Sequence, residues 1–221
     1  MEENPLKLVE QYIIETDVNV FLTGKAGTGK TTFLHKLLKE CPKRLVVAAP
    51  TGVAAINARG VTLHSLFQLP FGPFVPGSSY SSEKKWARFS RDKRNLIKNL
   101  DLLIIDEISM VRADLLDSVD NTLKKVRRSD KPFGGVQLLM IGDLYQLPPV
   151  IKPDEQQLLK EHYATPYFFS STALRKKDLR VFELTKVYRQ EDESFITILN
   201  QIRNNSLRPE MLKQLNNRVL P

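Results

Sequence analysis

The chain has 221 residues, of which 42% are hydrophobic, so it can bury a core and is not a disordered segment. Lys and Arg total 33 against 25 Asp and Glu, and this net charge of +8 suits a polyanionic partner or a phosphorylated ligand without identifying either. The single cysteine, Cys41, excludes an intramolecular disulfide and a cysteine-rich zinc site and favours a reducing compartment. With no signal peptide and no apolar window of membrane-spanning length, we expect a soluble intracellular protein without a membrane partner.

Apolar runs of strand length alternate with helical patterns along most of the chain. The patterns predict helices at residues 6–15 and 30–39, and strands at 18–22, 44–49, 102–106, 136–142 and 178–184. Apolar residues at steps of three and four predict one more helix over 113–128. Strands that are apolar throughout and are separated by helices favour a mostly parallel sheet covered on both faces, which is an α/β fold.

One segment interrupts this alternation. Residues 69–82 are rich in Pro, Gly, Ser and aromatic residues, and residues 83–99 are strongly basic and could be helical. We interpret them as part of a small insertion at the edge of the main domain.

The stretch TGKAGTGKTT, residues 23–32, lies between the first predicted strand and the next predicted helix, and it matches G-x-x-x-x-G-K-[ST]. The glycines let successive backbone N–H groups point at phosphate oxygens, and the helix presents its positive end to them. Lys30 is expected to reach the β- and γ-phosphates, and the Thr31 hydroxyl is expected to ligate Mg²⁺. The predicted nucleotide-binding residues are Gly24, Lys25, Ala26, Gly27, Thr28, Gly29, Lys30, Thr31 and Thr32.

Two later strand ends carry polar residues that suit hydrolysis. Asp106 closes the apolar strand LLIID, where its carboxylate can hold Mg²⁺ through water, and Glu107 could orient or deprotonate the attacking water. A solvated acidic pair is the alternative, but beside a phosphate-binding loop the pair favours hydrolysis over simple binding. Gln146, in GDLYQLPPV, is placed to detect the γ-phosphate, unless it is an ordinary loop glutamine.

Two stretches favour a nucleic-acid partner. In APTGVAAINARG (49–60) the backbone amides could contact a phosphodiester chain, and TLHSLF (62–67) adds a histidine, a serine and an aromatic ring. The aromatics Phe67, Phe71, Phe74 and Tyr80 could stack on bases or pack the insertion, and the basic run Lys84, Lys85, Arg88, Arg91, Lys93 and Arg94 could bind DNA or form a solvated face. The candidate DNA contacts are Thr51, Gly52, Val53, His64, Ser65 and Phe67.

The stretches GKAGTGKTT, APTGVAAINARG, TLHSLF, LLIIDEISMV and GDLYQLPPV occur in this order and resemble the successive motifs of superfamily-one helicases of the PIF type, relatives of RecD. Residues 114–135 resemble that family's own signature, and residues 182–203 resemble its next motif. The resemblance implies a RecA-like domain that uses ATP and Mg²⁺ to unwind DNA and moves 5′ to 3′ on single-stranded DNA. It also implies that Arg189 contacts the γ-phosphate as an arginine finger, although this residue could equally form a structural ion pair. The upstream glutamine that reads adenine in such helicases lacks a clear counterpart, because Gln11 lies too close to the phosphate-binding loop.

We therefore expect residues 1–63 and 100–208 to form the first RecA-like domain, residues 64–99 to form the insertion, and residues 209–221 to begin a second RecA-like domain. The expected catalytic residues are Lys30, Asp106, Glu107, Gln146 and Arg189. On this interpretation the chain is the ATP-binding half of a monomeric helicase for tailed or forked DNA. It would serve DNA repair, replication, recombination or telomere maintenance at a prokaryotic nucleoid or in a nucleus. The alternatives are a P-loop kinase, a nucleotide-switch protein, and a nucleic-acid-binding module with a vestigial nucleotide site.

Overall fold

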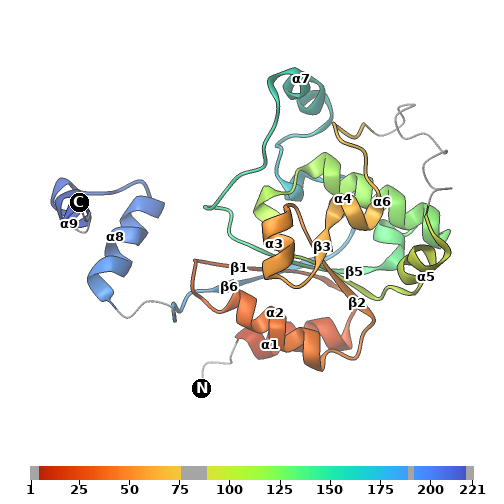
Figure 1. Ribbon diagram of the computed structural model, residues 1–221, viewed down its shortest axis with the longest axis horizontal. Helices are drawn as coiled ribbons and strands as arrows, with labels where there is room; N and C mark the ends of the chain where they lie inside the picture. Colours follow the sequence, from red (N-terminus) through yellow and green to blue (C-terminus); the bar gives the residue numbers. More distant parts are fainter. Residues whose placement is uncertain (1–4, 76–88, 189–191, 218–221) are drawn as a thin grey trace.

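The computed structural model describes residues 5–75, 89–188 and 192–217. Its centre is a six-stranded sheet in the order β3-β2-β4-β5-β1-β6, in which every neighbouring pair of strands is parallel. The strands are β1 (Asn19–Gly24), β2 (Leu45–Ala49), β3 (Val61–Thr62), β4 (Leu102–Ile105), β5 (Gln137–Gly142) and β6 (Leu179–Leu184). Helices lie on both faces of the sheet (Figure 1), which confirms the predicted α/β class.

The central strands are apolar because both of their faces are covered. All four residues of β4 and all six residues of β5 are buried, as expected for parallel strands between two helical layers. Leu139 of β5 lies opposite Ile104 of β4 on one side and Val20 of β1 on the other. This register brings the carboxyl ends of β4, β5 and β1 together at one edge of the sheet.

Two helical layers complete the core. The layer of α1 (Pro5–Glu15) and α2 (Lys30–Glu40) covers one face, and α4 (Leu63–Phe67), α5 (Arg91–Asn99) and α6 (Ala113–Arg127) cover the other (Figure 1). The apolar stripe predicted for α6 is buried and consists of Leu116, Val119, Leu123 and Val126. The remaining helices are α3 (Gly52–Asn57), α7 (Pro153–His162), α8 (Glu193–Arg203) and α9 (Pro209–Asn216), with single 3-10 turns at η3 (Ile108–Met110), η4 (Pro132–Gly135), η5 (Phe168–Ser170) and η6 (Leu174–Lys176).

Helix α6 also buries aspartates that hold neighbouring loops. The Asp117 carboxylate accepts hydrogen bonds from the Tyr163 hydroxyl (3.0 Å), the Ser171 hydroxyl (2.5 Å) and the backbone N–H groups of Thr172 (3.1 Å) and Ala173 (3.0 Å). One turn further on, Asp120 accepts the backbone N–H of Phe133. Since a buried carboxylate is stable only where its lone pairs are satisfied, the polar residues of this segment are explained by the loops that they fasten.

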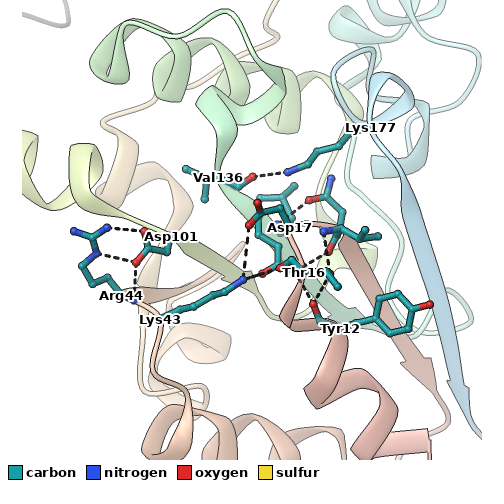
Figure 2. A network of polar contacts seen from close by, with 12 residues as sticks. Tyr12, Thr16, Asp17, Lys43, Arg44, Asp101, Val136 and Lys177 are labelled. Carbon is teal, nitrogen blue, oxygen red and sulfur yellow. Dashed lines mark hydrogen bonds and ion pairs between the residues drawn. The ribbon is translucent and has the colours of Figure 1, made fainter. Parts of the chain in front are cut away.

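The amino end of the sheet is closed by a network of polar contacts (Figure 2). The Lys43 ammonium donates to the Thr16 carbonyl (2.7 Å) and to the side-chain oxygen of Gln137 (2.8 Å). The Gln137 amide donates in turn to the carbonyls of Tyr12 (3.2 Å) and Val18 (2.7 Å). Beside them Lys177 donates to a backbone carbonyl, that of Val136 (3.1 Å), and Arg44 pairs with Asp101 at 2.7 Å. These polar groups are therefore satisfied within the protein, whereas the buried side-chain nitrogen of Asn19, at the start of β1, has no hydrogen-bond partner among the described residues.

Both described ends of the predicted insertion pack into the main core. Phe67 in α4 is 1% exposed and Ile97 in α5 is fully buried, in the same apolar cluster as the sheet. The stretch between them, residues 76–88, lies outside the described residues. No helix within the described ranges is both long and apolar enough to cross a bilayer.

Candidate functional site

A cavity of about 420 Å³ lies at the carboxyl edge of the sheet. The loops that follow β1, β4 and β5 reach it, together with the segment after β6, as expected for parallel α/β sheets, in which ligands bind outside the carboxyl ends of the strands. Its lining residues are Ala26, Gly27, Gly29, Lys30, Thr31, Thr32, Glu107, Gln146 and Tyr188. The cavity therefore unites four of the predicted motifs, because Tyr188 belongs to the stretch 182–203.

The phosphate-binding loop joins β1 to α2. Gly27 (φ 79°) and Gly29 (φ 92°) have left-handed backbones, which favour glycine, and Gly29 is the residue that precedes the first turn of α2. The Lys30 ammonium donates to the carbonyls of Gly24 (2.5 Å) and Lys25 (2.9 Å) across the loop. Burial lowers the pKa of Lys30, while the negative charges of Asp143, Glu107 and Asp106 act in the opposite direction.

The nine residues predicted to bind nucleotide divide into two groups. Six of them line the cavity, from Ala26 to Thr32, with Thr28 as the exception. The Thr28 side chain is buried and donates to the Lys25 carbonyl (2.8 Å), so it braces the loop. Gly24 also lies outside the cavity lining, and the Lys25 ammonium turns away to the side-chain oxygen of Asn200 (2.7 Å) in α8.

The acidic pair stands directly after β4. Glu107 lines the cavity and has a left-handed backbone (φ 52°, ψ 44°), which is unusual for a residue with a side chain. Burial raises the pKa of Glu107, and the neighbouring Asp106 raises it further. Burial also raises the pKa of Asp106, against the lowering effect of Lys30. A nearby cation would therefore stabilise the ionised form of both carboxylates.

The donor set fits magnesium. In the described ranges no group of three or more His, Cys, Asp or Glu residues could hold a metal ion by itself. Mg²⁺ in nucleotide sites is typically bound by one or two protein oxygens and completed by phosphate and water oxygens. The exposed Thr31 hydroxyl and the Asp106 carboxylate offer such a pair beside the cavity.

The loop after β5 places Gln146 at the cavity and fastens it to a buried acid. The Gln146 amide nitrogen donates to the Asp143 carboxylate (3.1 Å), which also accepts the backbone N–H of Tyr145 (3.1 Å) and pairs with Arg203 of α8. Sequence reasoning missed Asp143 and Arg203, and it also missed Tyr188, which lines the cavity and whose N–H donates to the Gly27 carbonyl (2.8 Å). Arg189, the predicted arginine finger, lies outside the described residues.

The candidate DNA contacts sit beside the next strand ends. Thr51 caps α3 by accepting the Ala54 N–H (3.2 Å), and Gly52 and Val53 are exposed in its first turn. His64 is partly buried and stacks on the ring of Phe71 (5.4 Å between centroids), which is 93% exposed. Burial lowers the pKa of His64, as does the charge of Arg112.

Ser65 and Phe67 differ sharply in exposure. Ser65 is exposed, and its carbonyl accepts the Lys93 ammonium (2.6 Å). Phe67 is buried in the core, so its ring cannot stack on a base, and its prediction as a DNA contact is corrected.

The other aromatic and basic candidates belong to the predicted insertion. Phe74 is partly buried, and its N–H donates to Asp114 (2.9 Å). Tyr80, Lys84, Lys85 and Arg88 lie outside the described residues, while Arg91, Lys93 and Arg94 belong to α5.

This fold and this cavity together define a P-loop nucleotide-binding domain of the RecA-like class. The model of the PIF1-like helicase family matches residues 5–211, and the chain belongs to this family. It is 35% identical over 214 residues to the ATP-dependent DNA helicase RRM3 of Saccharomyces cerevisiae, covering 95% of this chain and 28% of that protein. Against the human ATP-dependent DNA helicase PIF1 the identity is 37% over 199 residues, covering 89% and 29%.

Solved structures agree with this assignment. The crystal structure of a Pif1 helicase from Bacteroides in complex with ADP-AlF3 and ssDNA superposes with a TM-score of 0.91 at 45% identity. The match covers 100% of this chain and 51% of that one. The chain thus spans about half the length of this solved relative and under a third of the two curated relatives.

Proposed function

We propose that this chain is the ATP-binding motor domain of an ATP-dependent DNA helicase that moves 5′ to 3′ on single-stranded DNA. The observation that carries this proposal is the meeting of Lys30, Glu107 and Gln146 around one cavity at the carboxyl edge of the sheet. These are a phosphate-binding cation, a base and an amide, which are the groups that phosphoryl transfer to water requires.

Each of these groups has a separate task. Lys30 balances the charge of the β- and γ-phosphates, and Glu107 accepts a proton from the attacking water. Gln146 senses the γ-phosphate or orients the water. Thr31 and Asp106 would hold Mg²⁺, which would supply positive charge to the phosphates. Arg189 is assigned the arginine-finger role by its place in the family motif.

DNA is proposed to run past the neighbouring strand ends. The start of α3, with the partly buried Thr51 and the exposed Gly52 and Val53, follows β2 in the parallel sheet, and His64 and Ser65 follow β3. Strand β2 pairs with β4, and the acidic pair directly follows β4, so a short connection links the proposed DNA and nucleotide sites. The Bacteroides relative was solved with a nucleotide analogue and ssDNA together, which supports this arrangement.

The proposed substrates are tailed and forked duplexes. One solved relative is described as two coordinating Pif1 helicases at forked dsDNA, and it covers 97% of this chain at 47% identity. We propose the monomer as the unit that binds one nucleotide, and two such units can act at one fork. We propose that the protein acts in the compartment that contains the DNA, which is the nucleoid in a prokaryote or the nucleus in a eukaryote.

The test measures ATP hydrolysis and strand release by the protein at the full length of its gene. We expect hydrolysis that single-stranded DNA stimulates, and ATP-dependent release of a labelled strand from a duplex with a 5′ tail. A duplex with a 3′ tail is the polarity control, and Lys30→Ala is the control for the nucleotide site. Hydrolysis that DNA does not stimulate, or phosphate transfer to an acceptor other than water, would contradict the proposal.

A further inference from the structure

Helix α8 contacts the nucleotide site at two points far apart in sequence. Asn200 accepts a hydrogen bond from Lys25 in the phosphate-binding loop, and Arg203 forms an ion pair with Asp143 in the loop of Gln146. The two α8 residues are three positions apart and so share one face of the helix. Figure 1 shows α8 beyond the carboxyl edge of the sheet, which agrees with these contacts.

The ion pair between Arg203 and Asp143 is well shielded from solvent. The Asp143 side chain is 1% exposed and the Arg203 side chain is 16% exposed. The Arg203 guanidinium also lies 4.4 Å from the centre of the Tyr145 ring, which fixes its position from a second side. Because a buried charge without a partner is strongly unfavourable, the Arg203 guanidinium stabilises the charge of the Asp143 carboxylate. Burial raises the pKa of Asp143, but the hydrogen bonds from Arg203, Tyr145 and Gln146 outweigh it, and the net shift is downward.

Asp143 decides which end of the Gln146 amide faces the cavity. An ionised carboxylate only accepts hydrogen bonds, so the amide nitrogen of Gln146 must face it, as the 3.1 Å contact shows. The amide oxygen is then left to accept a hydrogen bond, which is what a group that orients a water molecule needs to do. This arrangement has a cost, because it places a negative carboxylate beside a site for a negative phosphate.

The charge of Asp143 acts on the phosphate-binding lysine. Among the groups that raise the pKa of Lys30, Asp143 has the largest effect, while Arg203 acts in the opposite direction. Without Arg203, the Asp143 carboxylate would attract Lys30 and repel a terminal phosphate.

We propose that Arg203 is a positioning residue for the γ-phosphate: it neutralises Asp143, so that Asp143 can orient Gln146 without repelling the terminal phosphate of the nucleotide. This inference rests on the proposed nucleotide site and adds to it Arg203, a residue that does not line the cavity and to which the sequence motifs assign no role. It follows that α8 is coupled to the occupancy of the γ-phosphate position.

The test compares a triphosphate with a diphosphate and needs no turnover. Equilibrium affinities of the 221-residue chain are measured by fluorescence with methylanthraniloyl-labelled AMPPNP and ADP in the presence of Mg²⁺. Arg203→Gln, which keeps a long polar side chain but loses the charge, should weaken AMPPNP binding about tenfold and ADP binding less than about twofold. Arg203→Lys, which keeps the charge, should stay within about threefold of the parent for both nucleotides.

Two further variants separate this role from general support of the fold. Arg208→Gln removes the same charge from an exposed arginine five positions along and should change neither affinity. Asp143→Asn combined with Arg203→Gln removes both charges and should restore AMPPNP affinity to within about threefold of the parent. This double variant buries no unpaired charge and should fold even if Arg203→Gln alone does not. Its AMPPNP affinity then still tests the proposed role of Arg203.

The outcomes are distinct. Equal weakening of both nucleotides by Arg203→Gln, no weakening, or no restoration in the double variant would overturn the role of Arg203 and leave the proposed function standing. A parent chain that binds neither nucleotide would overturn the nucleotide site itself, and this inference with it.

Discussion

Glu107 combines two unusual properties at one position. Its backbone is left-handed, which costs roughly 1 kcal/mol for a residue with a side chain, and burial followed by the charge of Asp106 raises the pKa of its carboxyl group. Such strain persists where the surroundings enforce it, and it often marks functional sites. Here it turns the carboxylate into the cavity, and the raised pKa makes that carboxylate a stronger base.

Replacing this base should separate nucleotide binding from hydrolysis. In the full-length protein, Glu107→Gln keeps the size of the side chain but cannot accept the proton, so turnover should fall about a hundredfold or more while affinity for Mg²⁺-ATP is retained. Lys30→Ala is the contrasting control and should weaken binding itself. Steady-state hydrolysis and equilibrium nucleotide binding measure the two effects. Turnover of Glu107→Gln close to that of the parent would show that Glu107 is not the base.

Sequence reasoning was strongest for residues whose chemistry is local and weakest for contacts made through folding. Lys30 and Glu107 stand in short motifs tied to the end of one strand, so their place at the cavity could be predicted. The pairing of Asp143 with Arg203 joins positions 60 apart, and no local pattern encodes it. Phe67 was mistaken for a DNA contact, although its position after Leu63 and Leu66 follows the three- and four-residue spacing of a buried helix face.

At the scale of elements, α6 is held to its neighbours by buried acids as much as by its apolar stripe. Asp117 is the clearest case, because four groups from the loop between α7 and β6 or its flanks donate to one carboxylate. The periodic stripe predicted the helix and its buried face. The partners of the aspartates on that face could not be predicted from the sequence, since Tyr163 and Ser171 lie 46 and 54 residues after Asp117.

Removing the Asp117 carboxylate should therefore cost more than removing any one of its donors. Asp117→Ala leaves several buried donors without an acceptor and should lower the free energy of unfolding by about 3 kcal/mol or more. Tyr163→Phe removes a single hydrogen bond and should cost about 1 kcal/mol. Urea unfolding of both variants measures the difference, and a loss for Asp117→Ala no larger than that for Tyr163→Phe would contradict this account.

The network at the amino end of the sheet predicts how stability changes in alkaline solution. Burial lowers the pKa of Lys177 in the folded protein, although Asp17 acts in the opposite direction. Between this lowered pKa and the ordinary lysine value of about 10.4, the unfolded chain binds more protons than the folded one, so Lys177 adds stability as the pH rises. Lys177→Met should flatten this part of the stability curve, as measured by urea unfolding at a series of pH values. If the slope of stability against pH were the same in Lys177→Met as in the parent, Lys177 would not be the cause of the pH dependence.

For the molecule as a whole, the described residues around the cavity all come from one RecA-like domain, and the chain spans 51% of a solved relative. In P-loop enzymes an arginine supplied from an opposing surface contributes on the order of 10³ or more in rate, and such an arginine would act in addition to Arg189 of this chain. A single domain also offers one DNA-binding site. Movement along DNA needs two such sites whose separation changes with the state of the bound nucleotide.

The 221-residue chain by itself should therefore bind Mg²⁺-nucleotide, and single-stranded DNA weakly, yet show negligible DNA-stimulated hydrolysis and no strand separation. The assay follows release of a labelled strand from a duplex with a 5′ tail, with the full-length protein as the positive control. ATP-dependent unwinding by the 221-residue chain as a monomer would refute this expectation.

The all-parallel sheet also governs how such a domain bears mechanical load. The cavity residues and the proposed DNA contacts all lie at the carboxyl edge, so a pull on the DNA directed away from this edge would act along the strands. The ladder hydrogen bonds run across the strands, so tension along them is a shear that the whole sheet shares at once. At the far edge Lys43 and Gln137 tie the chain before β1 to the starts of β2 and β5, and they would act as the anchor against which that tension is held.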